Sequence, residues 1–369
     1  MQKLNICLVS LTVAPDSKDG AGRSIRGIFD YLRRQGHNVK LITGKWNTDL
    51  NDPDIIQFNL IPKRFLWAPH FIKKAVGFIN NHNFDILHGN APKGTLPINL
   101  SKKKKYITTI HDMGPFETSF TKIPIERFII KYAIEKATLV TTVSHFIKKE
   151  IEYFIPNVDR NKIFIHYNGI ENSFKPFPKE ARKLRDQLKI EGPVLVYIGR
   201  IAFYKGVDDI IKAYKIAKAK IHNLNLIIGG SPDFQMKKKF EEWKVKYNDI
   251  HFIGFVEENK LPYYYTLGDI FITYSYASEG FGLTLIEAIA CGTPVICSSM
   301  IAYKEILTDN AIFVPPRNPQ QLAKEIISLL KDDSKREALV KKAQKFIHRY
   351  SWESVGQNIE KIYDKFLNN

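Results

Sequence analysis

The chain has 369 residues, 44% of them hydrophobic and 25% charged, which excludes a disordered or fibrous protein. This length exceeds the size at which one hydrophobic core usually stops growing, so two domains are expected. The net charge of +17 favours phosphate-bearing partners, whether nucleotides, anionic lipid surfaces or nucleic acid, and does not distinguish among them.

The cysteines and the lengths of the apolar runs indicate the cellular compartment of the protein. Cys7, Cys291 and Cys297 lie in apolar segments without metal-ligand spacing, as expected for free thiols in a reducing cytosol. The first residues lead directly into a strand pattern, so no signal peptide is predicted. No run approaches the ~20 apolar residues that a membrane-spanning helix requires. We therefore expect a cytoplasmic protein that does not cross a membrane.

The first half of the chain alternates strand and helix patterns. Residues 4–13 form a near-continuous apolar run, which is typical of a strand buried on both faces of a parallel sheet. Gly20-Ala21-Gly22 and a helix pattern closed by Gly36 follow. Further strands are predicted at residues 39–43, 86–88, 106–110, 139–143 and 162–165.

The pattern restarts after a polar, Pro-rich stretch at residues 173–178, which suits a domain linker. Strands are predicted there at residues 194–198, 224–228, 251–253, 270–273, 294–298 and 311–314, and a last helix pattern covers residues 352–366. Alternating strands and helices predict an α/β fold with doubly wound sheets. We expect two Rossmann-like domains, residues 1–172 and 173–351, facing across a cleft in which ligands bind.

The segment from Glu279 to Glu287 is the most informative part of the sequence. Its first half, Glu-Gly-Phe-Gly, is a Gly-rich turn, and its second half reads as the start of an apolar helix. A turn of this kind brings backbone N–H groups and a helix N-terminus to one place, which favours an anion. The two carboxylates suggest that the same ligand also carries hydroxyl groups. A nucleotide-sugar has both properties.

Arg200 and Lys205 follow the strand predicted at residues 194–198. Ligand sites in open α/β sheets lie at the carboxyl ends of strands, so both cations are placed to meet a ligand. Arg binds a phosphate bidentately and Lys adds a mobile point charge. The alternative is a pair of solvated surface cations. The nearby glutamates and the expected cleft favour a role in neutralising a diphosphate.

Other strand ends carry weaker signals. Gly230 and Gly254 each end a strand. In one interpretation they line a nucleotide pocket. In the other they only permit tight turns, and this second interpretation fits Gly230 better than Gly254. Gly20-Ala21-Gly22 lacks the full dinucleotide-binding spacing. His111, followed by Asp112, ends the strand at residues 106–110. A lone His is more often structural than catalytic, but this strand-end position favours a functional role.

In this order the motifs resemble the retaining, GT-B-fold glycosyltransferases of family 4, a group that includes mannosyl- and glucosyltransferases. The resemblance extends over nearly the whole chain. It is carried by Gly20-Ala21-Gly22, His111-Asp112, Thr142-Val143-Ser144, Asn168-Gly169-Ile170, Gly199-Arg200 with Lys205-Gly206, Phe252-Ile253-Gly254-Phe255 and Glu279 to Glu287. The spacing of the two glutamates around Gly-Phe-Gly is its most specific element.

The resemblance implies a hexosyltransferase whose second domain holds a UDP- or GDP-linked sugar donor. Arg200 and Lys205 would bind the diphosphate, Glu279 and the following amides the sugar, and Glu287 the ribose. The donor-binding residues implied are Gly22, Gly199, Arg200, Lys205, Gly254, Phe255, Glu279, Gly280, Phe281, Gly282, Leu283 and Glu287. The catalytic residues implied are His111, Arg200, Lys205 and Glu279. No metal or other cofactor is expected, and the final helix, about 352–369, would cross back onto the first domain.

The acceptor is expected to be a glycan or a lipid-linked sugar. Residues 63–79 combine Lys and Arg with aromatic and aliphatic side chains at helical spacing, and Lys102–Lys105 form a basic run in the same domain. Both features fit peripheral docking on an anionic membrane, at the inner face of the cell membrane. The alternative is an ordinary core-packing helix with a solvated basic face.

Two other classes of function remain open at this point. A sugar-nucleotide epimerase or a glycan phosphorylase can use a fold of this kind, although the Glu279–Glu287 segment favours transfer. A basic nucleic-acid-binding protein would need a reading helix or an aromatic-studded sheet. The sequence offers neither, so no nucleic-acid partner is expected.

Overall fold

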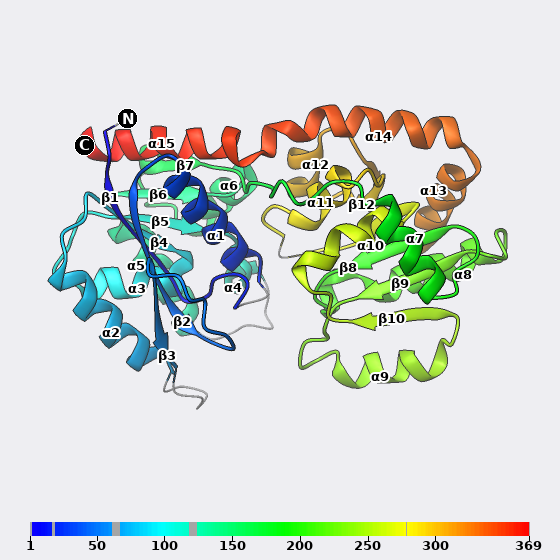
Figure 1. Cartoon of the computed structure of the whole chain (residues 1–369), viewed down its shortest axis with the longest axis horizontal. Helices are drawn as coiled ribbons and strands as arrows, with labels where there is room; N and C mark the ends of the chain where they lie inside the picture. Colours follow the sequence, from blue (N-terminus) through cyan, green and yellow to red (C-terminus); the bar gives the residue numbers. More distant parts are fainter. Residues whose placement is uncertain (1, 17–18, 61–66, 118–123, 278, 369) are drawn as a thin grey trace. The chain divides into compact units, whose positions relative to one another are not determined.

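A computed structural model describes residues 2–16, 19–60, 67–117, 124–277 and 279–368. The chain forms two compact units (Figure 1). Unit 1 comprises residues 1–169 and 350–369, and unit 2 comprises residues 170–349. The sequence placed the corresponding boundaries after residues 172 and 351. The prediction of an α/β fold with parallel sheets is confirmed for each unit.

Within the described residues, unit 1 contains a seven-stranded parallel sheet with the order β3-β2-β1-β4-β5-β6-β7. Its strands are β1 (Asn5–Ser10), β2 (Asn38–Lys45), β3 (Ile55–Asn59), β4 (Ile86–Asn90), β5 (Ile107–Ile110), β6 (Leu139–Thr142) and β7 (Ile163–Ile165). β1 and β4 at the centre are almost entirely buried, because helices cover both faces of the sheet.

The sequence did not predict β3. Among the described strands it pairs with β2 alone, at the edge of the sheet, and most of its residues are half-buried or exposed. An edge strand of this kind lacks the long apolar run that marks the central strands, so its pattern is weak.

The helices and 3-10 turns of unit 1 are α1 (Gly20–Arg34), α2 (Trp67–Asn81), α3 (Ala91–Leu100), α4 (Gly114–Glu117), α5 (Pro124–Lys136), α6 (His145–Phe154), η2 (Arg160–Lys162) and α15 (Trp352–Asn368), and the 3-10 turn η5 (His348–Tyr350) begins in unit 2 and ends at the first residue of this last part of unit 1. α15 packs beside α1 in one hydrophobic core (Figure 1). A Cβ added to Gly27 or Gly169 would lie 1.9 or 2.3 Å from the Trp352 ring, so the ring fills space that only glycine leaves. The Tyr31 hydroxyl also donates to Glu360 at 2.9 Å.

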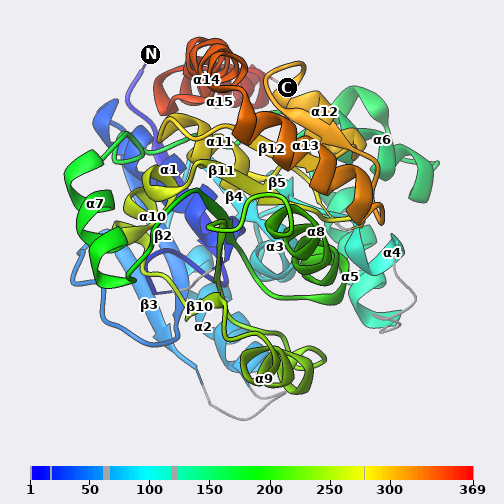
Figure 2. The same ribbon diagram turned by 90° about the vertical axis from the view of Figure 1, so that its right-hand side faces the viewer.

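Unit 2 contains, within its described part, a six-stranded parallel sheet with the order β10-β9-β8-β11-β12-β13. Its strands are β8 (Val194–Ile198), β9 (Asn225–Gly229), β10 (Ile250–Gly254), β11 (Ile270–Thr273), β12 (Val295–Ser298) and β13 (Ile312–Val314). Its helices and 3-10 turns are α7 (Pro178–Gln187), η3 (Phe203–Lys205), α8 (Val207–Lys218), α9 (Lys237–Lys246), η4 (Glu258–Lys260), α10 (Leu261–Leu267), α11 (Leu283–Ala290), α12 (Ile301–Leu307), α13 (Pro319–Lys331) and α14 (Asp333–Ile347). Figure 2 shows α8 beside α13, and both share a core with α9.

The stretch predicted as a linker belongs to unit 2. Phe174 is 5% exposed, and the Phe177 ring packs edge-on against Tyr263 with centroids 5.2 Å apart. Its aromatic side chains therefore anchor this stretch to the unit that follows it.

Candidate active site

The loop after β8 brings two cations to the carboxyl edge of the sheet in unit 2. Arg200 lies two residues after the last residue of β8, and Lys205 ends η3. Tyr204 lies between them, because Arg200 donates to its hydroxyl and the Lys205 ammonium lies 5.6 Å from its ring centroid. Tyr204 therefore holds both cations in one loop. The sequence interpretation did not identify this residue.

Two glycines make the shape of this loop possible. Gly206 has φ +66°, and a Cβ there would lie 2.2 Å from the Tyr274 carbonyl oxygen. Gly230 has φ +134°, and its Cβ would lie 1.8 Å from the carbonyl oxygen of Gly199. Contacts this short exclude any side chain. The backbone at Gly206 therefore packs directly against that of Tyr274, and the backbone at Gly230 against that of Gly199. For Gly230 the structure therefore provides a purely conformational reason for glycine.

Glu279 meets the cationic loop. Lys205 Nζ donates to Glu279 Oε1, and Ser275 Oγ donates to the same oxygen at 2.8 Å. The side chains of Lys205 and Glu279 are 20% and 9% exposed, so water only weakly screens this ion pair.

The cations and the carboxylate act on one another electrostatically. Burial lowers the pKa of Arg200, but Tyr204 and the carboxylates of Asp233 and Glu279 outweigh it, and the net pKa is raised. The structure thus brings together three of the predicted site residues, Arg200, Lys205 and Glu279.

The turn between Glu279 and α11 is tightly packed. Gly280 is buried and Phe281 is 3% exposed. Gly282 has φ +90° and precedes the first helical residue, Leu283. A Cβ on Gly282 would lie 2.7 Å from Leu285 and 2.9 Å from the Tyr303 ring. The turn therefore delivers the N-terminus of α11 at a position that the side chains around it define.

Glu287 lies within α11 and is 1% exposed. Tyr265 in α10 donates its hydroxyl proton to Glu287 Oε2 at 2.8 Å. A buried carboxylate is costly without hydrogen-bond donors, and this hydroxyl supplies one. The predicted contact with a ribose stays a prediction.

Gly254 and Phe255 end β10 in a more open environment. Gly254 has φ +69°, and no atom lies within 4 Å of where its Cβ would be. Phe255 is 44% exposed. The open space beside Gly254 contrasts with the crowding at Gly230, so only the former leaves room for a ligand.

In unit 1, Asn90 joins three loops at the carboxyl edge of the sheet. Its amide nitrogen donates to Ser10 Oγ and to the Ala21 carbonyl, both at 3.1 Å. Its Oδ1 lies 2.7 Å from His111 Nε2. Because Oδ1 can only accept, Nε2 carries the proton of the imidazole. The sequence interpretation did not identify Asn90, although its position at the end of β4 is the kind of signal that singled out His111.

His111 is kept neutral by its surroundings. Burial, followed by the proximity of His166, lowers its pKa to about 3. At neutral pH the imidazole is therefore an uncharged group with a defined tautomer.

Gly22 lies in the first turn of α1. Its amide donates to the side chain of Asp19, the N-cap residue, at 2.7 Å. An acidic cap at this position already uses one of the N–H groups that would otherwise attract an anion. The contact with a diphosphate implied for Gly22 stays a prediction.

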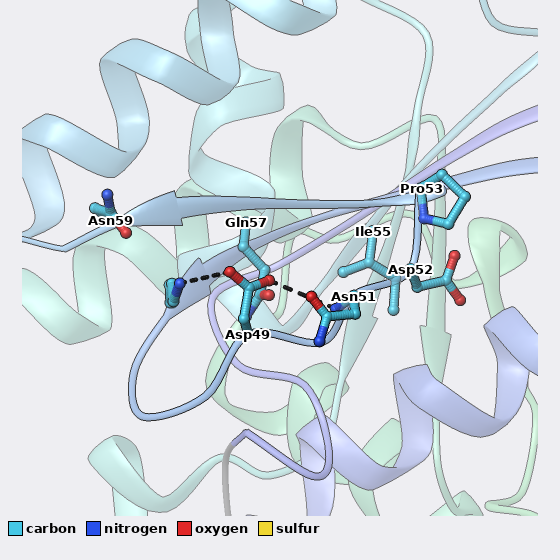
Figure 3. A pocket seen from close by; sticks show the side chains of 8 residues that line it. Asp49, Asn51, Asp52, Pro53, Ile55, Gln57 and Asn59 are labelled. Carbon is cyan, nitrogen blue, oxygen red and sulfur yellow. Dashed lines mark hydrogen bonds and ion pairs between the residues drawn. The ribbon is translucent and has the colours of Figure 1, made fainter.

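A polar hollow lies beside the edge strands of unit 1, away from the predicted residues (Figure 3). It is lined by Lys45, Asp49, Asn51, Asp52, Pro53, Ile55, Gln57 and Asn59. Lys45 pairs with Asp49 at 2.7 Å, and Gln57 accepts from the backbone of Leu50 at 2.8 Å. These hydrogen bonds stabilise the loop between β2 and β3, so Lys45, Asp49 and Gln57 have a structural role in it.

The basic segments predicted to meet a membrane are partly described. Residues 61–66 lie outside the described residues. In α2 the apolar residues Phe71, Ala75 and Ile79 are at most 1% exposed, whereas Lys73 and Lys74 are exposed. The core-packing alternative therefore accounts for this face of α2. No described helix is both long and apolar enough to cross a membrane.

No group of three or more His, Cys, Asp or Glu side chains in the described part of the chain is arranged to hold a metal ion. Arg200, Lys205 and Glu279 lie together at the edge of the unit 2 sheet. Two doubly wound parallel-sheet units are the architecture of the GT-B fold, which a solved structure shares with this chain at a TM-score of 0.81.

Comparison with known proteins identifies the family. Residues 18–174 match the family "Glycosyltransferase Family 4", and residues 180–346 match "Glycosyl transferases group 1". The chain belongs to these family 4 glycosyltransferases.

Relatives match over most of their length. An uncharacterized glycosyltransferase of Methanocaldococcus jannaschii is 27% identical over 98% of both chains. The O-antigen chain mannosyltransferase B of Escherichia coli is 27% identical, covering 80% of this chain and 75% of the relative. The phosphatidyl-myo-inositol mannosyltransferase of Mycolicibacterium smegmatis is 24% identical, covering 95% and 91%. The structure of Anabaena HepE in complex with UDP and glucose has a TM-score of 0.81 at 20% identity, covering 98% and 99%.

Proposed function

We propose that this glycosyltransferase moves a hexose from a UDP- or GDP-linked donor to a glycan or lipid-linked acceptor, with retention of anomeric configuration. The proposal rests chiefly on one observation, the contact of Lys205 with Glu279 beside Arg200. The relatives are consistent with it. HepE is seen with UDP and glucose, and two relatives are mannosyltransferases by name.

The chemistry follows from the charges. Cleavage of the bond between sugar and diphosphate creates positive charge on the sugar and negative charge on the leaving group. Arg200 and Lys205 stabilise the leaving diphosphate. Because Tyr204 and Glu279 already hold these cations, little reorganisation is needed when the charge develops. Glu279 and the turn that follows it bind the donor sugar.

Retention would arise if the acceptor attacks from the face that the diphosphate leaves. In this proposal Glu287 binds the ribose, Gly254 and Phe255 border the base, and Gly22 approaches the diphosphate. Neutral His111, with its proton on Nε2, contacts the donor sugar. Cationic side chains replace a divalent metal, so activity should survive treatment with EDTA.

The experiment is a panel of UDP- and GDP-sugars, screened first for thermal stabilisation and then for sugar transfer. We expect stabilisation by one base and one sugar, and NMR of the product should show the donor's anomeric configuration. A converted sugar still attached to its nucleotide would identify an epimerase instead. Phosphate-dependent release from a glycan would identify a phosphorylase. Tight filter binding of RNA or DNA without nucleotide-sugar stabilisation would favour a nucleic-acid-binding protein.

We also propose that the protein works at the inner face of the cell membrane, through α5 as well as the basic run at Lys102–Lys105. On α5, Ile125 and Phe128 are 61% and 64% exposed, and Phe128 stacks on Tyr132 with centroids 5.8 Å apart. These residues recur at helical spacing. Arg127 and Lys131 are exposed on the same helix. An apolar stripe flanked by cations is complementary to an anionic bilayer.

Co-sedimentation with liposomes tests the surface on α5. The Ile125→Glu/Phe128→Glu variant should lose binding to vesicles that contain phosphatidylglycerol. A matched control is Val245→Glu, because Val245 is 87% exposed on α9 of unit 2. Absence of wild-type binding at low salt would rule out the membrane proposal, and equal binding by both variants would rule out α5.

A further inference from the structure

A buried tyrosine outside the Glu279–Glu287 segment is hydrogen-bonded to each of its two glutamates. For Glu279 the link passes through Ser275, and for Glu287 it is direct. We propose that Tyr303 in α12, acting through Ser275, and Tyr265 in α10 are positioning residues that orient Glu279 and Glu287 respectively. This inference rests on the proposed function, since it assigns the two tyrosines to the donor site.

The chain to Glu279 has two hydrogen bonds. The Tyr303 hydroxyl donates to Ser275 Oγ at 3.2 Å, and Ser275 Oγ donates to Glu279 Oε1 at 2.8 Å. Tyr303 is 1% exposed and Ser275 is fully buried. Burial and then the Glu279 charge raise the pKa of Tyr303, so its hydroxyl remains a donor. Because each hydroxyl has one proton, donation runs in a single direction towards the carboxylate.

Tyr303 also shapes the turn that carries the sugar-binding amides. Its ring is 2.9 Å from where a Cβ on Gly282 would lie. One side chain therefore contacts the turn through its ring and reaches Glu279 through its hydroxyl. Lys205, in the loop after β8, donates to the same carboxylate oxygen. Two donors therefore hold this oxygen in place.

The contact with Glu287 is direct. The Tyr265 hydroxyl donates to Oε2 at 2.8 Å, and both residues are at most 1% exposed. The tyrosine is itself fixed, because Thr293 Oγ1 donates to its carbonyl at 2.5 Å and its ring packs edge-on against Phe271 at 5.3 Å. This hydrogen bond therefore restrains the position of one oxygen of the Glu287 carboxylate.

A positioning role and a merely structural role give different kinetics. If Tyr303 orients the sugar-binding carboxylate, Tyr303→Phe should lower kcat about tenfold and leave KM for the donor within about twofold. If Tyr265 orients the ribose-binding carboxylate, Tyr265→Phe should weaken nucleotide binding by about tenfold. A structural role alone would lower stability without this division.

The experiment compares Tyr303→Phe, Tyr265→Phe and the control Tyr214→Phe in the full chain. Tyr214, in α8, is a fully buried tyrosine of unit 2 whose hydroxyl donates to Asp249 Oδ2 at 3.2 Å, away from the segment. Titration calorimetry uses UDP and GDP with their 2′-deoxy and 3′-deoxy forms. Tyr265→Phe should reduce the preference for the ribose form, and Tyr214→Phe should not. Equal weakening of ribose and deoxyribose binding would overturn the role of Tyr265.

A second measurement separates this inference from the proposed function. Double-mutant cycles in urea pair Tyr303→Phe with Glu279→Gln and Tyr265→Phe with Glu287→Gln, and need no substrate. We expect each pair to be coupled. Coupling in both pairs, in a protein that binds neither UDP nor GDP, would overturn the donor-site assignment and with it the positioning role. Absence of coupling in an active enzyme would overturn this inference alone.

Discussion

The contact between Lys205 and Glu279 allows one prediction to be worked through in detail. Lys205→Met removes the ammonium and keeps most of the apolar stem. Glu279, with a side chain 9% exposed, then retains the Ser275 hydroxyl as a donor but loses its ion-pair partner. Breaking a fully buried pair from one side costs about 3–5 kcal/mol. Because Lys205 is 20% exposed, water recovers part of this, and we expect a loss of about 2 kcal/mol in the free energy of unfolding.

The loss of activity should be larger than the loss of stability. A preorganised group that stabilises developing charge contributes about 10²–10³ in kcat. Lys205→Met should therefore lower kcat by about this factor while the protein remains folded. The Lys205→Met/Glu279→Gln variant should be less destabilised than the sum of the single changes, because it leaves no uncompensated charge.

Urea unfolding and donor turnover provide the two assays. Of the four tryptophans, Trp243 is the single one in residues 170–349 and lies in the core of unit 2, so its contribution to the fluorescence reports on that unit, beside the contributions of Trp46, Trp67 and Trp352 from unit 1. Lys212→Met is the control. Lys212 pairs with Asp209 on α8 but is 63% exposed, and its replacement should change neither quantity appreciably. Wild-type kcat in Lys205→Met would refute the proposed role of the cation, and additive stabilities would refute the coupling.

Three further predictions concern stability. Gly230→Ala should destabilise unit 2 strongly in urea unfolding, because its Cβ would lie 1.8 Å from a carbonyl oxygen, whereas Gly36→Ala, with φ +87° and open space, should cost about 1 kcal/mol. Burial lowers the pKa of His88 to about 3 and of His166 to about 4, so the unfolded chain binds more protons between pH 6.5 and 4. Unit 1 should therefore lose stability as the pH falls through this range, and a flat profile would contradict the burial of both rings. Burial and a neighbouring carboxylate raise the pKa of Glu150 to about 8, so between pH 6.5 and 8, where the two histidines no longer contribute a slope, the stability of unit 1 should fall as the pH rises. Glu150→Gln should remove that fall in thermal melts.

The sequence predicted those parts of the fold that depend on local pattern. Buried parallel strands such as β1 and β8 are apolar along nearly their whole length, so their ranges are close to those observed. β3 was missed because an edge strand has only one neighbour and leaves alternate side chains partly exposed. On α2, periodicity identified an apolar face, but periodicity alone does not tell whether a core or a membrane covers that face.

The site was predictable only in outline. The strand-end argument placed Arg200 and Lys205 at the edge of a sheet, the Gly-rich turn before a helix singled out Glu279, and the structure brings the three together. Ser275, Tyr303 and Tyr265 were not identified, because their role depends on contacts between helices and loops distant in sequence. A buried tyrosine has no sequence signal that distinguishes a hydrogen-bond donor to a carboxylate from ordinary core packing.

The return of α15 to unit 1 has a consequence for the order of events during synthesis. The core of unit 1 includes Trp352, Ile359 and Phe366, which are the last core residues to leave the ribosome. Unit 2, encoded between the two parts of unit 1, has its whole sequence available earlier. The N-terminal half must therefore wait for the C-terminus before its core is complete, with part of its apolar surface uncovered in the meantime. A premature stop shortly before residue 352 would thus damage the unit that was made first.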